Sequence, residues 1–577
     1  MFPVVLLLGL FGMTARPATD PDLWWHLRTG QWIVETGHIP HSDPFSFTRA
    51  GHAWVSHEWL SEVVFYELWK HGGAAALIVF SAIITTAGFM LLYLRCLLCG
   101  GKRHWAAAAT AFGALAAAPS WGARPQMFTF ALASLLLWLL EAGTKKDRPR
   151  LLFWIPPLFL LWLNLHAGFA LGPALLLAYG VGLIMEIAVG ATPWQQARPV
   201  LLRVLLLLVA CLALVPLNPS GAQLYRYPLD TLRSPGMRSF IGEWHSPDFH
   251  EWAYRPFLLV WLLLLTALAS SRWRPHGRVI VPLLLTSLAA LDAVRHIPIF
   301  VLLAMPVIVA ALPAAGANPE LPWTPKAAAL RSAWMGGGAR PHTNGPSRFR
   351  PLFNGAVVVL IAVFALVRWV SLARNQDARE AEQFPKNAVA ILRATAPSPG
   401  DSSFHVFVYY DWGGYAIWKL YPEYRVFVDG RADLYGDDLL RQFETAVQLR
   451  TGWRDVLERW KVEAVLVPPS CALAQVLLLD PNWHGAFSDA KTILLLRTPP
   501  PSKILPFSRY RSQRGKKVKE YFPEPSRICE TRAHRDWFPN CSRIGSFKRK
   551  PERSQECEIW LNSCGTMRKG RTSRNTP

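Results

Sequence analysis

Long apolar stretches alternate with short polar connections from the N-terminus to about residue 372. Several of them approach the ~20 residues that an untilted helix needs to cross a hydrocarbon core of ~30 Å. The pattern therefore predicts a polytopic α-helical membrane protein with about eleven spans. Their expected ranges are 1–18, 73–94, 104–119, 126–142, 151–164, 168–189, 200–217, 256–271, 278–292, 297–314 and 352–372.

The first apolar stretch has more than one interpretation. It is short, no basic residue precedes it, and the small residues of "TARPATD" follow it. A membrane span fits the loop pattern best. A cleaved signal peptide is the alternative, because such peptides have short apolar cores and small-residue cleavage sites. A start codon assigned downstream of the true one would also shorten this segment.

Basic residues set the expected orientation, because Lys and Arg are enriched in cytoplasmic loops. They gather in every second connection, namely "CGGKRH", "GTKKDRPR", "QARPVLLR", "SRWRPHGR" and 316–350. We therefore expect a bacterial-type cytoplasmic membrane protein with its N-terminus inside. The first loop, 19–72, and everything after residue 373 are then extracytoplasmic, and 316–350 is a flexible cytoplasmic linker in a membrane domain of residues 1–372.

Residues 373–500 follow a different pattern. Runs of β-forming residues at about 404–410, 425–429, 463–468 and 491–497 alternate with helical segments, which favours an α/β layer. We expect an extracytoplasmic α/β domain here. Residues 501–577 lack periodicity and are expected to be a disordered tail. Their abrupt change of composition suggests a read-through or frameshifted end.

Composition supports this division. Only 17% of the 577 residues are charged, against about a quarter in soluble domains. The tail holds 19 Lys+Arg and 7 Asp+Glu, so it supplies +12 of the net charge of +22. The basic balance is therefore no evidence of a nucleic-acid groove, and we expect no nucleic-acid partner.

The first loop opens with "TDPDLWWHLRTGQWIVETGHIPHSDPFSFT". Helical spacing of its apolar residues predicts a helix after Pro21 that stops at Gly37. A second amphipathic helix is expected in "AWVSHEWLSEVVFYELW". Two such helices lying on the membrane surface would hold Asp22 and Glu58 over the outer end of the bundle. An interfacial aromatic belt is an alternative explanation for the tryptophans of this loop, such as Trp24.

Unusual polar residues near the span ends all map to the extracytoplasmic face of this topology. Such a gathering predicts one polar cavity at the outer end of the bundle. For any single residue, a helix cap or an ordinary loop position is the simpler interpretation. The set comprises Asp20, Asp22, His26, Asp43, His57, Glu58, Arg124, Asn164, His166, Asn218, Glu243, His245, Arg295 and His296.

The segments "DPDLWWHLRTGQWIVETG" and "GHAWVSHEWLSEVVFY" resemble the first extracytoplasmic loop of the GT-C superfamily of membrane glycosyltransferases, in the branch that includes protein O-mannosyltransferases and aminoarabinose transferases. The resemblance extends to the architecture of residues 1–372. The adjacent acidic pair common in that branch is split here as Asp20-Pro-Asp22, and Glu58 stands in the place of a second acidic residue.

In the C-terminal domain, "YYDWGGY" is similar to the aromatic–Asp–aromatic–Gly motif of the oligosaccharyltransferase catalytic subunit. The similarity implies acceptor binding by Tyr410, Asp411 and Trp412, with Asp429 and Arg431 of "VDGR" nearby. The alternative is that the glycines of both motifs serve a tight turn and a strand end.

The resemblance implies transfer of a sugar, with inversion, from a polyprenyl-phosphate or pyrophosphate carrier to a protein, lipid or glycan acceptor. Asp22 is then the expected base, with Glu58 or Asp43 second. Arg124 and Arg295 would bind the donor phosphate. His166 and His296 would assist, or would join carboxylates around a divalent cation such as Mg or Mn, although no metal motif is visible.

Two other classes of protein compete with an enzyme. A transporter would show internal repeats or broken helices at mid-membrane, and neither is found in the sequence. A non-catalytic membrane scaffold with a partner-binding outer domain would explain the aromatic-rich domain but not the acidic first loop.

Overall fold

The computed structural model describes residues 1–145, 148–271, 273–315, 349–394 and 404–498 of the chain. The predicted tail and nearly all of the predicted cytoplasmic linker lie outside these ranges. Each of the eleven predicted apolar segments contains a helix. These helices are α1 (Phe2–Thr14), α3 (Trp59–Leu98), α4 (Arg103–Ala116), α5 (Gln126–Lys145), α6 (Ile155–Leu165), α7 (Leu171–Ala188), α8 (Trp194–Leu214), α11 (Arg255–Ser270), α12 (Gly277–Asp292), α13 (Ile297–Ala315) and α15 (Phe349–Arg374).

Length and apolarity qualify seven helical segments of the described chain as membrane spans. The other four of the eleven helices, α1, α4, α6 and α12, have fewer than 18 residues, whereas α11 reaches 19 residues together with the turn that precedes it. The polytopic class is thus confirmed, whereas the count of eleven and the orientation stay predictions.

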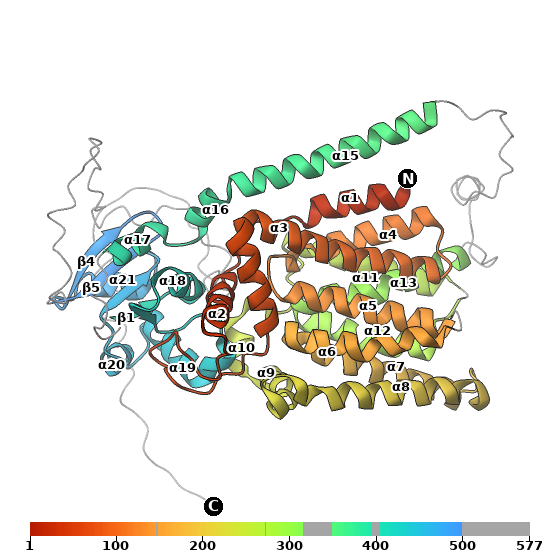
Figure 1. Cartoon of the computed structure of the whole chain (residues 1–577), viewed down its shortest axis with the longest axis horizontal. Coiled ribbons are helices and arrows are strands. Elements are labelled where there is room, and N and C mark those ends of the chain that lie inside the picture. The colour runs from red at the N-terminus through yellow and green to blue at the C-terminus, as the bar shows by residue number, and fades with distance from the viewer. Residues whose placement is uncertain (146–147, 272, 316–348, 395–403, 499–577) are drawn as a thin grey trace, which may run out of the picture. The chain divides into compact units, whose positions relative to one another are not determined.

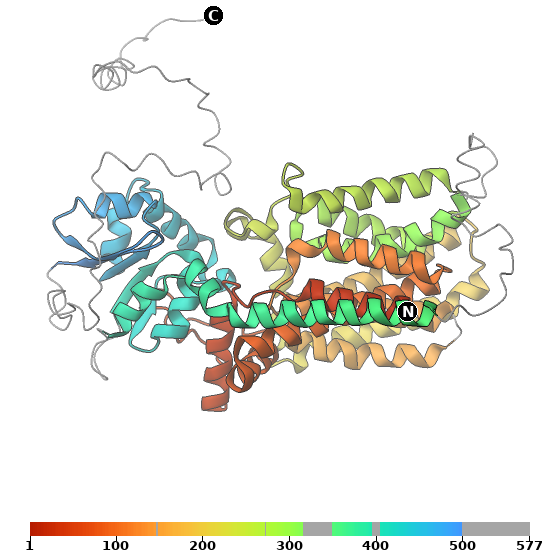
Figure 2. The same cartoon turned by 90° about the horizontal axis from the view of Figure 1, so that it is seen from above.

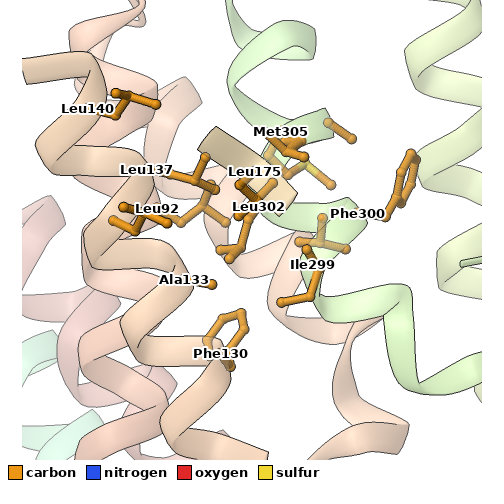
Figure 3. Packing of buried hydrophobic residues seen from close by; sticks show 14 of the residues in the cluster. Leu92, Phe130, Ala133, Leu137, Leu140, Leu175, Ile299, Phe300, Leu302 and Met305 are labelled. Atoms are coloured by element: carbon orange, nitrogen blue, oxygen red, sulfur yellow. The ribbon is translucent and has the colours of Figure 1, made fainter. Parts of the chain in front are cut away.

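Helix α13 forms the centre of the bundle. It packs against α3, α4, α11 and α12, and 83% of its apolar window is buried. Leu302 of α13 converges with Leu92 of α3 and Leu137 of α5 in one continuous apolar core (Figure 3). Helix α15 lies beside α1 at the periphery (Figures 1 and 2) and buries only 11% of its apolar window. Such an apolar exterior is suited to lipid.

The first loop folds as its periodicity predicts. Helix α2 (Leu23–Thr36) ends at Gly37, whose φ of 72° lies in the left-handed region that glycine tolerates. Helix α3 begins at Trp59 but is broken at Gly73, with φ of 57°. Two loop helices therefore precede the first long span.

The C-terminal domain carries a five-stranded mixed sheet of order β2-β1-β3-β5-β4. Its strands are β1 (Phe404–Val408), β2 (Tyr424–Val426), β3 (Ala464–Val467), β4 (Trp483–Ser488) and β5 (Ile493–Arg497). Strand β1 pairs in parallel with β2 and β3, while β5 is antiparallel to β3 and β4. The four predicted strands are confirmed and β4 was missed. The domain boundaries at 372 and 500 stay predictions.

Helices surround the sheet, in the order α16 (Gln376–Gln383), α17 (Lys386–Ala394), α18 (Gly413–Leu420), α19 (Ala432–Val447), α20 (Trp453–Arg459) and α21 (Ala472–Leu477). Two short helices, α9 (Tyr227–Arg233) and α10 (Pro235–Phe240), lie between α8 and α11. Helix α10 packs on α19.

The first loop is part of the core of the C-terminal domain. Trp24 is fully buried, with its ring edge-on to Tyr415 and Phe384 at centroid distances of 5.0 and 5.4 Å. The alternative explanation of Trp24 as part of a membrane-interface belt does not account for this burial. Further along the loop, Thr48 donates a hydrogen bond to the carbonyl of Phe427 at 2.6 Å. The loop and the domain thus position each other.

Candidate active site

Arg124 gathers three carboxylates, and we call this group the Arg124 cluster. Its Nε lies 3.1 Å from Asp20 Oδ2, its Nη2 lies 3.1 Å from Asp22 Oδ2, and its Nη1 pairs with Glu243. Asp20 and Asp22 stand just before α2, and Arg124 precedes α5. Glu243 comes from the connection between α10 and α11. Every donor face of this guanidinium is therefore occupied by a carboxylate of the protein.

The Arg124 cluster holds more negative than positive charge. Burial raises the pKa of Asp20 to about 7, against the opposing effect of Arg124, and Asp22 and Glu243 raise it further. Burial also acts to raise the pKa of Glu243, but Arg124 and Arg295 together lower it. Asp20 therefore holds a proton for part of the neutral range, whereas Glu243 stays ionised.

The C-terminal domain reaches Asp22 through two strand ends. Strands β1 and β2 run in parallel, so the segments that follow them lie at the same edge of the sheet. Asp411 follows β1, and burial together with the charge of Asp22 raises its pKa to about 6. Gly430 follows β2, and a side chain there would overlap Asp22 Oδ1, so glycine permits this approach. Asp22 is thus placed where the first loop meets the domain.

Tyr410 adds a polar atom to this meeting point. Its hydroxyl is buried and has no hydrogen-bond partner among the described residues. Burial raises the pKa of Tyr410, and the charges of Asp22, Asp429 and Asp411 raise it further. A buried hydroxyl beside several carboxylates is costly unless it finds a partner. It is therefore available to a bound molecule.

Three histidines surround Glu58, and we call this group the Glu58 cluster. His57 Nε2 lies 2.9 Å from Glu58 Oε1, and His166 Nε2 lies 3.5 Å from the same oxygen. His26 Nε2 lies 3.6 Å from Oε2 and its Nδ1 lies 3.5 Å from Glu62. The first loop supplies Glu58, His57 and His26, while His166 comes from the turn after α6.

Two histidines of the Glu58 cluster, His57 and His166, have pKa values shifted in opposite directions. Burial lowers the pKa of His57, but Glu58 outweighs this effect and raises it to about 9. Burial lowers the pKa of His166 to about 4, so this ring is neutral. Burial raises the pKa of Glu58, but His166 and His57 hold it well below its ordinary range. Glu58 is therefore a paired carboxylate and a weak base.

Arg295 lies between the two clusters. Its guanidinium stacks over the Trp244 ring at 4.5 Å, and its charge acts on Glu243 and His166. Tyr227 links the Glu58 cluster to the domain, because its hydroxyl lies 3.4 Å from His57 Nε2 and donates to Asp433 at 3.2 Å. The predicted cavity residues thus form two adjoining groups.

Other predicted site residues have structural partners. Asp43 accepts hydrogen bonds from two backbone amides of its own turn and pairs with Arg431 at 2.8 Å. Arg431 also pairs with Asp429 at 2.7 Å, and all three side chains are buried. Asp43 is thus committed to fastening the first loop to the domain and is a poor candidate for a base.

Asn164 and Asn218 join three connections. The Asn164 side-chain carbonyl accepts from Trp59 Nε1 at 2.9 Å and from Asn218 at 3.1 Å. His296 pairs with the backbone carbonyl of Ala289 at 3.0 Å, and His245 is exposed. These residues sit beside the clusters and support the backbone around them.

Trp412 is buried, and its indole donates to the Gln383 carbonyl at 3.2 Å. This bond ties "YYDWGGY" to α16. Tyr410 and Asp411 of this motif lie within electrostatic range of Asp22, and Gly414 lies against the Pro21 carbonyl. Sequence reasoning missed Glu62, Tyr227 and Asp433. Glu62 could have been found, since it lies one helical turn after Glu58.

A cleft of about 610 Å³ opens beside the Arg124 cluster, and we call it the Arg16 cleft. Asp20 lines it, so it adjoins the acidic residues of the first loop. Its apolar walls include Trp121, Trp252 and Pro256. The cleft lies next to the predicted catalytic residues and was not foreseen.

No group of three or more His, Cys, Asp and Glu side chains in the described ranges is arranged to hold a metal ion. Asp20, Asp22 and Glu243 point at Arg124, and Glu58 is satisfied by histidines. A divalent cation would have to displace Arg124 to gain these ligands. The residues as placed do not fit a resident metal.

No protein-family profile matches the chain, and no curated protein is significantly similar to it. Solved structures do match. The archaeal oligosaccharyltransferase AglB from Archaeoglobus fulgidus, in complex with an inhibitory peptide and a dolichol-phosphate, has a TM-score of 0.51 and 13% identity over 81% of this chain and 69% of that chain. The two chains therefore share a fold, in agreement with the polytopic membrane fold that the sequence predicts.

Two further structures are similar at lower scores. ArnT from Cupriavidus metallidurans, bound to undecaprenyl phosphate, has a TM-score of 0.45 and 14% identity over 85% of this chain and 96% of that chain. The arabinofuranosyltransferase AftD from mycobacteria has a TM-score of 0.43 and 14% identity over 86% of this chain and 39% of that chain.

Proposed function

We propose that the protein is a membrane glycosyltransferase that moves a sugar from a polyprenyl-phosphate carrier to an acceptor on the extracytoplasmic side. The observation that carries the proposal is the position of Asp22. In a chain with the GT-C fold, this carboxylate lies between Arg124 and the C-terminal domain. Its side chain is 28% exposed, so a substrate can reach it.

Asp22 is the proposed base. The acceptor hydroxyl attacks the anomeric carbon of the donor sugar and transfers its proton to Asp22. The bond from the anomeric carbon to the carrier phosphate breaks, and the phosphate leaves with the bonding electrons. A carboxylate within hydrogen-bond reach of the hydroxyl speeds such a step by roughly 10²–10⁴-fold. Arg124 pairs with Asp22 at 3.1 Å and fixes its orientation.

The acceptor side is proposed to be formed by the C-terminal domain. Tyr410 has an unpartnered buried hydroxyl, and Asp411 faces the charge of Asp22. Together they offer a donor and an acceptor to a polar group beside the reacting hydroxyl. Protein, lipid and glycan acceptors all present such groups. The transfer assay described below identifies which class of acceptor receives the sugar.

No step of this reaction is routed through a metal, because the carboxylates are arranged around Arg124. Treating the membranes with EDTA and adding back Mg²⁺ or Mn²⁺ measures whether a divalent cation takes part. Full activity after EDTA supports the arrangement described here, whereas loss that Mg²⁺ or Mn²⁺ restores contradicts it.

The function is tested in membranes that contain the whole chain. Radiolabelled polyprenyl-phosphate sugars are supplied, and label transferred to any acceptor is counted. We expect transfer by the wild type and at least a hundredfold less by Asp22→Asn at equal folded amount. Asp248→Asn, in an exposed part of the 218–255 loop, is the matched control and should transfer normally. Unchanged transfer by Asp22→Asn would show that Asp22 is not the base. No transfer with any donor would refute the proposed function.

A further inference from the structure

Two arginines beside the Arg16 cleft have no acidic partner in the described part of the chain. Arg16 lines the cleft, and Arg368 of α15 lies within electrostatic range of it. Arg368 donates one hydrogen bond to the Ala15 carbonyl at 3.2 Å, and neither guanidinium has an ion pair with any described carboxylate. Like charges held together in this way repel each other unless an anion lies between or beside them.

Unused donors in the same place point to a ligand. The Nε atom of Arg16, the Nε atom of Arg368 and the indole Nε1 of Trp121 are all buried without a hydrogen-bond partner among the described residues. Arg16 stacks on Trp121, with 5.5 Å from its guanidinium carbon to the ring centroid. Buried N–H groups are costly when unsatisfied. Two of these N–H groups belong to the two arginines and the third to the indole on which Arg16 stacks, and the acceptor oxygens of a phosphate would satisfy them.

The backbone under Arg16 is firmly held. Gln376 of α16 makes two hydrogen bonds with Ala18, accepting from its amide at 3.2 Å and donating to its carbonyl at 2.7 Å. With the Arg368 bond to Ala15, this fixes the chain on both sides of Arg16. The site is therefore built before any ligand arrives, which reduces the entropy lost on binding.

The walls of the Arg16 cleft are apolar. Leu115, Pro119, Trp121, Trp252 and Pro256 line it, and the Trp252 side chain is 79% exposed. Free inorganic phosphate would leave these walls unused. An amphiphile with one phosphate and a hydrocarbon tail would contact both Arg16 and these apolar walls.

The sequence analysis expects Arg124 and Arg295 to bind the phosphate, but three carboxylates already occupy Arg124. Placing an anion there would oppose those charges. Arg16 is free, and the cleft that it lines is also lined by Asp20, two residues from Asp22. A sugar attached to a phosphate that is bound at Arg16 would therefore lie near Asp22, the proposed base, before transfer.

We propose that Arg16 and Arg368 form the binding site for the carrier phosphate of an isoprenoid-type lipid, with its tail along the apolar walls of the Arg16 cleft. This inference rests on the proposed function for the role of the bound lipid. Binding itself can be measured without any sugar transfer.

The test measures the affinity of the detergent-purified full chain for undecaprenyl phosphate. Arg16→Gln and Arg368→Gln should each bind at least about tenfold more weakly, the loss expected for a hydrogen bond to a charged group. Arg374→Gln, an exposed arginine on the same helix as Arg368, is the matched control and should bind like the wild type. Undecaprenol and inorganic phosphate should each bind far more weakly than undecaprenyl phosphate.

Equal affinity of wild type, Arg16→Gln and Arg368→Gln would overturn the site, as would equal binding of undecaprenol. Arg16→Lys, which keeps the charge, should stay within a few-fold of wild type and shows that loss in Arg16→Gln is not misfolding. Asp22→Asn should bind normally. If wild type binds the lipid phosphate but transfers no sugar, the proposed function fails while the binding site stands. If it transfers sugar and Arg16→Gln does too, only the site fails.

Discussion

At the scale of single residues, Asp411 is expected to give the reaction an acid limb. Burial and the charge of Asp22 raise its pKa to about 6, so Asp411 loses its charge as the pH falls through 6. A protonated Asp411 is a poorer hydrogen-bond acceptor for the substrate. Transfer by the wild type should therefore fall below pH 6.

Asp411→Asn should lower transfer about tenfold at pH 7.5 and should remove this limb from the pH profile. Asp438→Asn, an exposed aspartate of α19, is the control and should keep the wild-type profile. A limb at pH 6 that persists unchanged in Asp411→Asn would assign it to another group.

His57 should make the thermal stability depend on pH. Burial lowers its pKa, but Glu58 raises it to about 9, above the ordinary 6.5. The folded protein thus binds this proton more tightly than the unfolded chain does. The stabilisation is complete below pH 6.5 and is lost as the pH rises through 9. The Tm of the purified protein should fall by a few degrees across this window.

His57→Gln should start from a lower Tm and lose most of this slope. His166→Gln is the matched control from the same cluster, because burial holds the pKa of His166 at about 4 and its ring is neutral throughout the window. The same slope in wild type and His57→Gln would show that another group is responsible.

At the scale of elements, the turn after β2 is expected to position the base. A Cβ at residue 430 would overlap Asp22 Oδ1 and lie 3.1 Å from Trp25 Nε1. Gly430→Ala should displace the Asp22 carboxylate from its present position and lower transfer at least about tenfold at equal folded amount. Gly485→Ala of β4 meets its nearest atom at 3.7 Å and should transfer normally. Wild-type transfer by Gly430→Ala would mean that the C-terminal domain does not position the base.

Sequence periodicity predicted the elements that carry the first loop. The apolar spacing of α2 and its stop at Gly37 are local properties, so they are readable from a single chain. Strand β4 was missed because "WHGAFS" contains Gly485 and a register shift between Gly485 and Phe487, which interrupts the alternation that marks a strand.

At the scale of the whole molecule, the sequence predicted that these polar residues gather together but not how they pair. Arg124 and Glu243 are 119 positions apart, and Tyr227 and Asp433 are 206 apart. Spacing along the chain cannot specify such contacts, because they depend on how α5, α10 and the domain pack. Residues that were expected to line one cavity lie in two clusters, and we propose that Arg16 and Arg368, rather than Arg124, bind the phosphate.

The orientation of the molecule is the last prediction. Basic connections should be cytoplasmic, because Lys and Arg resist translocation, so the loop between α7 and α8 lies inside and the loop between α8 and α11 lies outside. An epitope inserted after Asp248, which is exposed, should bind antibody in intact spheroplasts. The same epitope after Gly190, also exposed, should bind only after permeabilisation. Both tagged chains should still transfer sugar, which confirms that they insert normally. An epitope at Gly190 that is accessible in intact spheroplasts would invert the topology and place Asp22 on the cytoplasmic side, where the acceptor would then have to be sought.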